Sequence, residues 1–591
     1  MMKWSKNIIF RLTHNYWEWF IILLLVVGFF FFTASFNYLS QDKAFIKWLS
    51  PDETANYISS KFYAENNNLA WFEKDNLLVK DIIHPRSFRS DFGLTKAVSF
   101  FGLPIVYGTL ASLFGVGILP YLTPMIGALG LIFFYLLIKN LFGRSNALIS
   151  TLLASVFPVY TYYAARSMFH NVLFLVALII GLYFASNILI KQPVQKAYFK
   201  KHWPGLVYAL LSGLFIGLAL ITRTSELLWL GPLMIGLWLL NIKRLGFIRP
   251  LIFILGVFIS FLPVLYWNNV LYGSFFASGY PGLTNSLTSL TKDSSDLATN
   301  FISGKFVELK ELLIKIKTTV FYFGFNLEQS YKMFNAYVRL MFPWLFFGAG
   351  LGMISFVAYF KDYKKSRWLF LLGWLGISAI LIVYYGSWVF FDNPDPKSFT
   401  IGNSYTRYWL PFYFGALPFV SLALIRLTGF LKHPAAIWGL RMAVVTVIAT
   451  LSIQFVWFDP AEGIAASIQK QKAARVEWSK VLSLTEPEAI IITRTSDKLL
   501  FPERKVIIGI FDDKNMIAEY AKLVKKVPLY YYNFSYQEKD LAYLNNGPLK
   551  EQGISLQLIA PITDRFNLYK INIVIPETEP VKNTSRFFKK K

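Results

Sequence analysis

The stretch WEWFIILLLVVGFFFFTASF, residues 17–36, decides the class of fold. A helix needs about 20 predominantly apolar residues to cross a hydrocarbon core of ~30 Å, and this run has that length. It lacks a small-residue cleavage site and further apolar runs follow, so we interpret it as a membrane span and not as a signal peptide. The whole chain of 591 residues is 55% apolar and only 16% charged. The sequence therefore predicts an α-helical polytopic membrane protein.

The net charge of +25 does not indicate a nucleic-acid partner. In membrane proteins the excess of Lys and Arg collects in cytoplasmic loops, and here it largely does so, with the remainder in the C-terminal part and its KKK tail. Attraction to anionic lipid or to a phosphate-bearing substrate is compatible with this charge. The chain has no cysteine, which excludes disulfides, thiolate metal sites and cysteine nucleophiles.

The distribution of basic residues predicts a cytoplasmic N-terminus and about eleven spans. We expect them at residues 17–36, 118–138, 146–164, 171–190, 204–221, 227–240, 250–271, 337–360, 368–390, 408–425 and 442–457. The apolar piece at 97–115 is expected to be re-entrant or half-embedded, because a full crossing would leave Lys139 and Arg144 outside. Long outer loops are expected at 37–96 and 272–335.

Residues 1–457 form the expected membrane domain, and residues 458–591 are expected to form an extracytoplasmic α/β domain. Short apolar runs such as EAIIITR and VPLYYYNF predict buried strands, and MIAEYAKLVKK predicts a helix between them. Neither GxxxxGK[ST] nor a strand-linked GxGxxG occurs, so neither of these phosphate-binding loops is expected.

Ionisable and aromatic polar residues gather at the expected outer ends of the spans. They are Asp52, Glu53, His84, Arg86, Arg89, Asp91, Arg166, His170, Arg223, Glu226, Asp392, Asp395, Arg407 and Tyr408. Ionisable groups near membrane depth are costly and usually face a cavity. Both signs at one level indicate a site that handles an anion and moves a proton.

Each of these groups also has a purely structural interpretation. SPDE, residues 50–53, is typical of a helix start, with Ser50 as the cap and Pro51 in the first turn. The second carboxylate is then free, and since neighbours on a helix point ~100° apart, one of the two acids is expected to face a cavity. Arg407 could snorkel toward the interface, and Arg223 could pair with Glu226. FDNPDP, residues 391–396, is typical of a turn, and lone histidines are more often packed than catalytic.

The order of these residues resembles the GT-C superfamily of polytopic glycosyltransferases, in particular the branch of protein O-mannosyltransferases and lipid A aminoarabinose transferases. The resemblance covers about residues 1–457. It rests on Asp52-Glu53 with Tyr57, the turn His84-Pro85-Arg86, the inner turn 141–144, Arg223 after the fifth span, and Arg407-Tyr408 with Pro411. Two positions depart from the pattern: His170 or Asn171 stands where many relatives have an Asp after Ser-Arg, and Arg86 replaces a second Pro.

The resemblance implies an inverting transfer of a sugar from a polyprenyl-phosphate donor to an acceptor hydroxyl on the outer face, with neither metal nor cofactor. It implies Asp52 as the base and Glu53 as its supporting neighbour. The expected contacts of the donor phosphate are Arg407, Arg223, Arg86 and Tyr408, and a second-loop site would contain Arg166, His170 and Asn171. The expected partners are membrane lipid, the lipid-linked sugar and an acceptor glycan, lipid or protein.

Three other functions remain open from the sequence. A transporter or flippase of a lipid-linked or anionic substrate would need a polar path to both faces, whereas mid-span charges are scarce. A membrane scaffold or sensor would use the C-terminal domain for binding. An oligosaccharide transferase would need a metal site with several carboxylates.

Overall fold

The computed structural model describes residues 2–191, 203–277, 279, 324–359, 361, 363–393, 395 and 397–574. Most of the expected outer loop 272–335, the basic segment 192–202 and the Lys-rich C-terminal tail lie outside these residues. The chain divides into two compact units. Unit 1 contains residues 1–46, 52–69 and 98–471, and unit 2 contains residues 47–51, 70–97 and 472–591.

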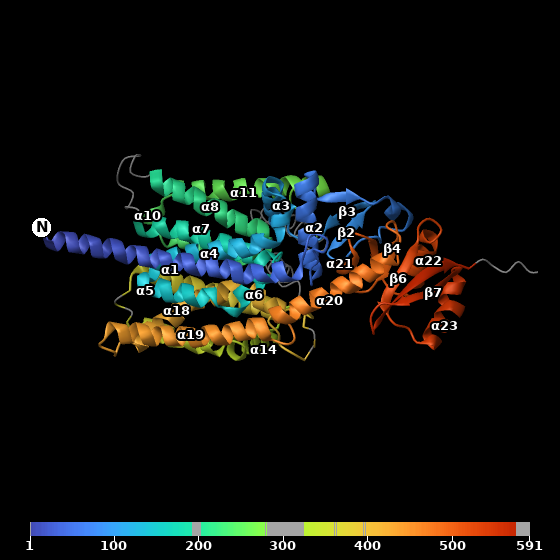
Figure 1. The fold of residues 1–591 in the computed structure, drawn as a ribbon. Coiled ribbons are helices and arrows are strands. Elements are labelled where there is room, and N and C mark those ends of the chain that lie inside the picture. Colours follow the sequence, from blue (N-terminus) through green and yellow to red (C-terminus); the bar gives the residue numbers. More distant parts are fainter. Residues whose placement is uncertain are drawn as a thin grey trace, which may run out of the picture. The chain divides into compact units, whose positions relative to one another are not determined.

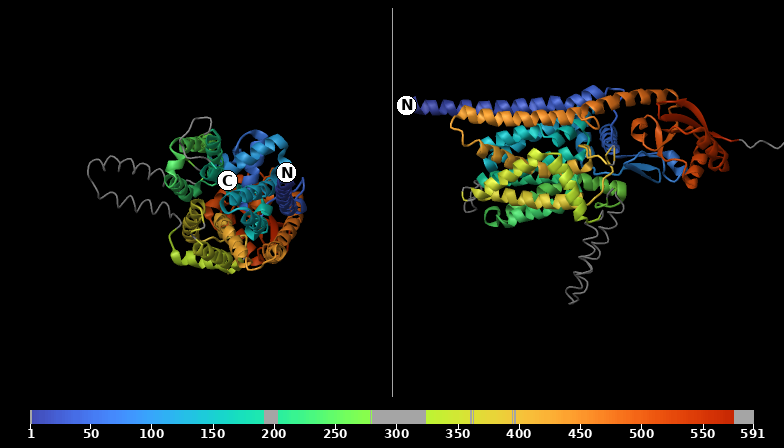
Figure 2. Two further views of the ribbon diagram at one scale, coloured as in Figure 1. Left: turned by 90° about the vertical axis from the view of Figure 1, so that its left-hand side faces the viewer. Right: turned by 90° about the horizontal axis from the view of Figure 1, so that it is seen from below.

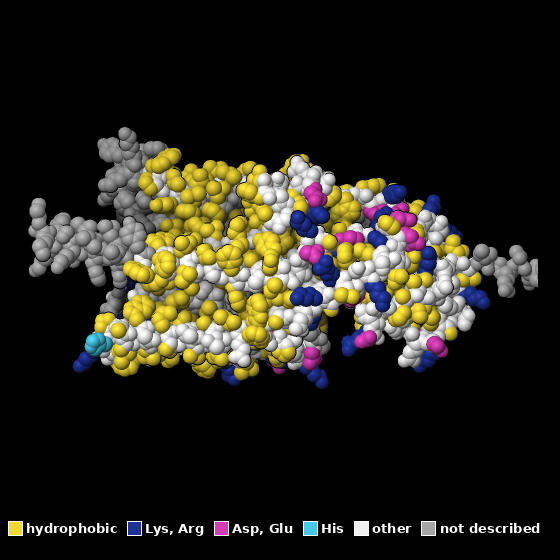
Figure 3. Space-filling model, viewed as in Figure 1, with side chains coloured by type: hydrophobic (Ala, Val, Ile, Leu, Met, Phe, Trp, Pro, Cys, Tyr) yellow, Lys and Arg dark blue, Asp and Glu magenta, His cyan; other side chains and the backbone are white. Residues whose placement is uncertain are grey.

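Unit 1 is helical, as the apolar runs predict (Figure 1). Its long helices are α1 (Met2–Ser40), α4 (Leu119–Phe142), α7 (His170–Lys191), α8 (Trp203–Thr222), α11 (Ile248–Tyr272), α16 (Lys365–Gly386), α18 (Leu410–Leu427) and α19 (Pro434–Phe458). Each provides a segment long and apolar enough to cross a membrane. On the face drawn in Figure 3, hydrophobic side chains cover most of these helices, whereas charged side chains are scattered over unit 2. The polytopic membrane architecture is confirmed.

Two expected spans are bent. The expected span 146–164 consists of α5 (Arg144–Ser155) and α6 (Pro158–Arg166), which meet at 52°, because Pro158 disfavours a helical Phe157 before it. The expected span 337–360 consists of α14 (Leu327–Phe334), the π-helical η5 (Asn335–Leu340) and α15 (Pro343–Ala358), with a bend of 94° just before Pro343. With each bent pair counted as one span, the described residues contain up to ten.

The shorter helices of unit 1 connect and cover the long ones. They are α2 (Pro51–Asn66), α3 (Gly102–Phe114), η2 (Val116–Ile118), η4 (Thr224–Glu226), α9 (Leu227–Leu239), α10 (Ile242–Leu245) and α17 (Ser404–Tyr408), and α20 (Ile464–Ser483) begins in this unit. At 13 residues, α3 has the length expected of a half-embedded helix. The helix α9 matches the predicted range 227–240 to within one residue, but its 13 residues are fewer than a full crossing needs.

Small residues and side-chain amides hold the helices together. On α8, a Cβ added to Gly213 would lie 2.0 Å from the carbonyl oxygen of Phe253 on α11, so only glycine permits this approach of two backbones. The Asn37 amide of α1 donates to the carbonyl oxygens of Pro120 and Ala165, each at 3.0 Å. It thereby ties α1 to the start of α4 and the end of α6. On the side of unit 1 seen at the top of the right-hand view in Figure 2 run α1 and α19, and near their ends the ring centres of Phe32 and Trp457 lie 5.3 Å apart.

Unit 2 contains a five-stranded mixed sheet in the order β5-β4-β6-β8-β7. Parallel pairs join β4 (Ile490–Thr493) to β5 (Lys505–Ile508) and β6 (Leu529–Phe534), and antiparallel pairs join β8 (Phe566–Ile573) to β6 and β7 (Ile554–Pro561). The helices are α21 (Asp497–Leu500), α22 (Lys514–Leu523), α23 (Glu538–Asn546) and α24 (Pro548–Glu551). The expected α/β domain is present, with β8 added to the strands that the sequence predicts.

Part of the expected outer loop 37–96 belongs to unit 2 and not to the membrane domain. There β1 (Ala70–Phe72), β3 (Leu94–Ala97) and β2 (Phe88–Asp91) form a small antiparallel sheet, and η1 (Lys74–Leu78) follows β1. Ile83 bridges to Ile507 of β5, and Lys505 pairs with Glu73 at 2.8 Å and Asp75 at 2.6 Å. These contacts explain why residues 70–97 fold as part of the unit that contains residues 472–591.

Candidate active site

The two adjacent acids of α2 have opposite surroundings. The helix begins at Pro51, as the SPDE pattern predicts, and carries Asp52 and Glu53 in its first turn. The Asp52 side chain is 51% exposed, whereas the Glu53 side chain is completely buried. One acid is thus open to a reactant and the other is enclosed by protein, in agreement with the ~100° between neighbouring side chains.

Glu53 is held by an arginine from α6. Its Oε1 accepts from Nε of Arg166 at 3.1 Å, and its Oε2 accepts from Nη2 at 2.6 Å. The remaining Nη1 of Arg166 donates to the Tyr162 hydroxyl at 2.7 Å. Such a fork-to-carboxylate pair fixes both partners, since each carboxylate oxygen is used. Glu53 and Arg166 therefore form a buried ion pair that anchors α2 to α6.

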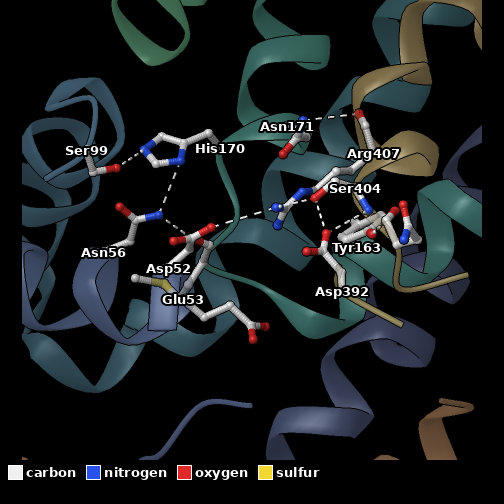
Figure 4. A network of polar contacts seen from close by, with 12 residues as sticks. Asp52, Glu53, Asn56, Ser99, Tyr163, His170, Asn171, Asp392, Ser404 and Arg407 are labelled. Atoms are coloured by element: carbon white, nitrogen blue, oxygen red, sulfur yellow. Dashed lines mark hydrogen bonds and ion pairs between the residues drawn. The ribbon is translucent and has the colours of Figure 1, made fainter. Parts of the chain in front are cut away.

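Arg407 approaches Asp52 from the other side of the site (Figure 4). Its Nη2 lies 3.7 Å from Oδ2 of Asp52 and donates to Oγ of Ser404 at 2.8 Å. Its guanidinium carbon lies 4.6 Å from the ring centre of Phe169. Its Nε is buried and has no hydrogen-bond partner among the described residues. This ion pair is longer than the buried pair of Arg166 and Glu53, whose closest atoms are 2.6 Å apart.

An acid from the preceding loop holds the short helix that carries Arg407. Both the backbone N–H and the hydroxyl of Ser404 donate to Oδ2 of Asp392, the former at 3.0 Å. The Asn403 side chain accepts from the backbone N–H of Tyr405 at 3.1 Å and thus caps α17. The turn interpretation fits Asp395, whose carboxylate accepts from the backbone of Lys397, whereas Asp392 orients the Arg407 helix.

Arg223 lies in a second buried network beside the first. Its Nε donates to Oε1 of Glu226 at 2.8 Å and its Nη2 donates to the Tyr385 hydroxyl at 2.9 Å, so the expected pair with Glu226 is confirmed. The ring centre of Tyr408 lies 4.4 Å from the guanidinium carbon of Arg223 and 5.3 Å from that of Arg407. Both expected phosphate contacts therefore flank one tyrosine ring.

His170 is the first residue of α7 and is held in one tautomer. Its Nε2 lies 3.2 Å from the carbonyl oxygen of Phe100 and must donate a proton there, so Nδ1 is the acceptor for the Asn56 amide at 3.3 Å. Asn56 also donates to the carbonyl oxygen of Met168 at 2.7 Å. Met168 has φ of 53°, a conformation that needs such support.

Asn171 joins the start of α7 to α17, because its amide donates to the carbonyl oxygen of Arg407 at 3.1 Å. The candidate second-loop residues thus all contact the site, each as a support for another residue. Sequence reasoning missed Asn56 as a functional residue. It lies four residues after Asp52, a spacing that places both on one face of α2 and could have identified it.

Arg86, an expected contact of the donor phosphate, is engaged with a buried acid of unit 2. Arg86 lies in unit 2, where its Nε and Nη2 donate to Oδ1 of Asp497 at 2.9 Å and 2.6 Å. Its Nη2 also donates to the carbonyl oxygen of Thr495 at 2.7 Å. Since Asp497 is buried, the guanidinium is needed there to neutralise it. Arg86 therefore joins residues 70–97 to the α/β fold of unit 2.

An apolar pocket opens among five helices of unit 1. Its lining includes Phe134, Leu175, Leu233, Phe370, Pro411 and Phe414, from α4, α7, α9, α16 and α18. Pro411 lies four residues after Arg407, so the pocket begins near the polar site and continues along the bundle. Among the described residues, no three His, Asp or Glu side chains gather closely enough to hold a metal ion.

Comparison with known families gives one match in sequence. The model of the family described as dolichyl-phosphate-mannose-protein mannosyltransferase matches residues 104–267. This segment runs from α3 to α11 and includes Arg166, His170 and Arg223. A search of curated protein sequences finds no match.

Solved structures of an oligosaccharyltransferase and of ArnT share the fold. The oligosaccharyltransferase AglB from Archaeoglobus fulgidus, in complex with an inhibitory peptide and a dolichol-phosphate, matches with a TM-score of 0.53 and 11% identity over 96% of this chain and 75% of that chain. ArnT from Cupriavidus metallidurans, bound to undecaprenyl phosphate, matches with a TM-score of 0.51 and 12% identity. The match covers 93% of this chain and 97% of that chain. Together with the family match, these structures confirm the resemblance of this chain to GT-C polytopic glycosyltransferases.

Proposed function

We propose that this protein is a membrane glycosyltransferase that moves a sugar from a polyprenyl-phosphate donor to an acceptor hydroxyl on the outer face of the membrane. The observation that carries the proposal is the Asp52–Arg407 pair. A half-exposed carboxylate lies 3.7 Å from a largely buried guanidinium, and the two come from separate elements. This is the arrangement needed for a proton acceptor facing a departing anion.

Asp52 would act as the general base. An acceptor hydroxyl is a weak nucleophile, and a positioned carboxylate can take its proton as the oxygen attacks. The new bond forms between that oxygen and the anomeric carbon, while the bond from this carbon to the phosphate oxygen breaks. The proton passes to Asp52 and the polyprenyl phosphate leaves with the electron pair. A single displacement of this kind inverts the anomeric configuration.

Arg407 would stabilise the departing phosphate. Guanidinium groups bind phosphate oxygens through several parallel N–H donors, and such donors are worth most in a site that excludes water. Nη2 already faces Asp52, and the buried Nε has no hydrogen-bond partner among the described residues. Arg223 adds positive charge across the Tyr408 ring, although Glu226 offsets part of it. We expect no metal or organic cofactor in this step, because these cations supply the charge.

The apolar pocket among the helices would hold part of the prenyl chain. It is lined almost wholly by aliphatic and aromatic side chains and begins four residues from Arg407. The two structural relatives that bind dolichol-phosphate and undecaprenyl phosphate support a donor of this class, as does the family match. The acceptor would reach Asp52 from its exposed side and would be a glycan, a lipid or a protein.

Replacing Asp52 by Asn tests the proposal, because the amide keeps the shape and removes the base. The purified full-length protein would be reconstituted with a lipid extract of its native membranes, and the consumption of each polyprenyl-phosphate sugar would be followed by mass spectrometry. We expect Asp52→Asn to lower the rate by about 10²–10⁴-fold. The matched control Asp395→Asn, in an exposed turn, is expected to keep it within about twofold. Normal consumption by Asp52→Asn would refute the proposal, as would a wild-type protein that consumes no such donor.

A further inference from the structure

A pocket lined by arginines lies at the opposite end of the helices from Arg407. The 18 residues of α18 separate the two by roughly 27 Å, at 1.5 Å per residue. The pocket has a volume of about 740 Å³, within the ~300–1,000 Å³ that is common for small-molecule sites. Four arginines line it, contributed by α5, α16, α18 and α19: Arg144, Arg367, Arg426 and Arg441.

Two of these arginines make their hydrogen bonds to neutral oxygens. Arg367 donates through Nε to the carbonyl oxygen of Leu141 at 2.8 Å, at the end of α4. Arg441 donates through Nε to the Thr428 hydroxyl at 2.8 Å and through Nη2 to the carbonyl oxygen of Ile425 at 3.3 Å. These bonds hold the guanidinium groups in place without cancelling their charge, and no ion pair with either arginine occurs among the described residues.

The other two arginines add to the positive charge. Arg144 pairs with Glu18, but Lys139 contacts the same carboxylate at 3.1 Å, so one acid serves two cations. Arg426 stacks on Tyr359, whose ring centre is 4.2 Å from the guanidinium carbon, and donates to the Tyr363 hydroxyl at 3.2 Å. Arg367 stacks on the same Tyr363 at 4.9 Å. The tyrosines hold the planes of two guanidinium groups beside the pocket.

The backbone contributes donors to the same pocket. The helix α5 starts at Arg144, directly after Gly143, whose φ of 90° suits glycine. No side chain caps this end, and Ser145 and Asn146 of the first turn line the pocket. The first N–H groups of a helix have no partner within the helix and attract anions. Four arginines and an uncapped helix start therefore surround one cavity.

We propose that this pocket binds a phosphate-bearing anion. Several guanidinium groups around one cavity repel each other until an anion enters, and a phosphate accepts from many N–H donors at once. The positive-inside rule places this end of the helices in the cytoplasm, so the anion is either the headgroup of an acidic phospholipid or a soluble phosphate compound. This binding goes beyond the proposed transfer and does not depend on it.

The test uses the full-length protein in a neutral detergent and measures the apparent melting temperature against ligand concentration. The probes are dioctanoyl phosphatidylglycerol, dioctanoyl phosphatidylcholine as a zwitterionic control, and inorganic phosphate at constant ionic strength. Stabilisation by phosphatidylglycerol with little response to inorganic phosphate identifies a lipid headgroup. The reverse identifies a soluble phosphate compound. If neither probe stabilises the wild-type protein, the proposal is wrong.

Variants then assign the binding to the pocket. The double variant Arg367→Gln/Arg441→Gln is expected to bind the probe that stabilises the wild-type protein at least tenfold more weakly. Because Arg367 and Arg441 also hold helix ends, Arg426→Gln provides a second variant at an exposed position and is expected to weaken binding at least threefold. Lys365→Gln removes a positive charge at the same end of α16 but outside the pocket, and should bind within twofold of wild type. Equal binding by Arg426→Gln and wild type would overturn the assignment.

Discussion

Replacing Glu53 by Gln separates a structural acid from the adjacent reactive one. Glu53 uses both carboxylate oxygens on Arg166, and their side chains are 0% and 9% exposed. Removal of one partner from a buried ion pair costs about 3–5 kcal/mol, because the other charge stays buried without compensation. The equilibrium constant for unfolding of Glu53→Gln would therefore be about a hundredfold or more above that of the wild type.

The adjacent residue is the matched control. The Asp52 side chain is 51% exposed and 3.7 Å from Arg407, so Asp52→Asn is expected to cost about 0–1 kcal/mol. The assay is the apparent melting temperature of each purified variant in the same detergent, with activity measured on the same samples. Glu53→Gln should melt several degrees lower and lose activity with its fold. Asp52→Asn should melt near the wild-type temperature and lose activity all the same.

A double variant tests whether the unpaired buried charge causes the loss of stability. Glu53→Gln/Arg166→Gln leaves no buried charge, so it should be less destabilised than the sum of the two single variants. If Glu53→Gln melts like wild type, the buried pair does not carry the stability that its geometry implies. If Asp52→Asn is destabilised as much as Glu53→Gln, Asp52 has a structural role and the reasoning is refuted.

Three further predictions concern Arg407, His170 and Arg86. Arg407→Gln is expected to lower kcat/KM for the polyprenyl-phosphate sugar by about 10²–10³-fold with normal melting, and an unchanged value would count against a phosphate contact. His170→Gln should keep more than a tenth of the activity and the wild-type shape of the pH profile, because both ring nitrogens are already engaged; loss of one ionisation from that profile would show that His170 transfers a proton. Arg86→Gln should destabilise unit 2 by about 2 kcal/mol, seen as faster hydrogen exchange around Asp497, and should leave the KM for the donor unchanged. A raised KM for the donor with normal hydrogen exchange around Asp497 would support the expected contact of Arg86 with the donor phosphate.

The sequence predicts the reactive end of the site better than its supports. SPDE marks the start of α2, and the ~100° between neighbouring helical residues predicts different surroundings for the two acids, which the half-exposed Asp52 and the buried Glu53 have. The positive-inside rule assigns loops to a side of the membrane, but it does not identify which side chains contact each other. That Arg166 belongs to Glu53, and that His170 is held by Asn56, depends on the packing of α2 against the α6–α7 connection.

For the fold, too, local features are predictable from the sequence and long-range contacts are not. Apolar runs predict the helices, because length and hydropathy are local properties of the chain. The prolines at 158 and 343 are local signals of the bends that precede them. Hydropathy alone does not show these bends, because the two helices of each bent pair form one apolar run. The assignment of Arg86 is different, because its partner Asp497 lies more than 400 residues later and no local pattern identifies such a contact.

A cryo-electron microscopy structure of the full-length protein with bound polyprenyl phosphate would test the central claim most directly. We predict that the phosphate lies within hydrogen-bond distance of the Arg407 guanidinium, with Asp52 facing the space beside it where the sugar and the acceptor hydroxyl meet. A phosphate that contacts neither Arg407 nor Arg223 while Asp52 faces away from it would contradict the account.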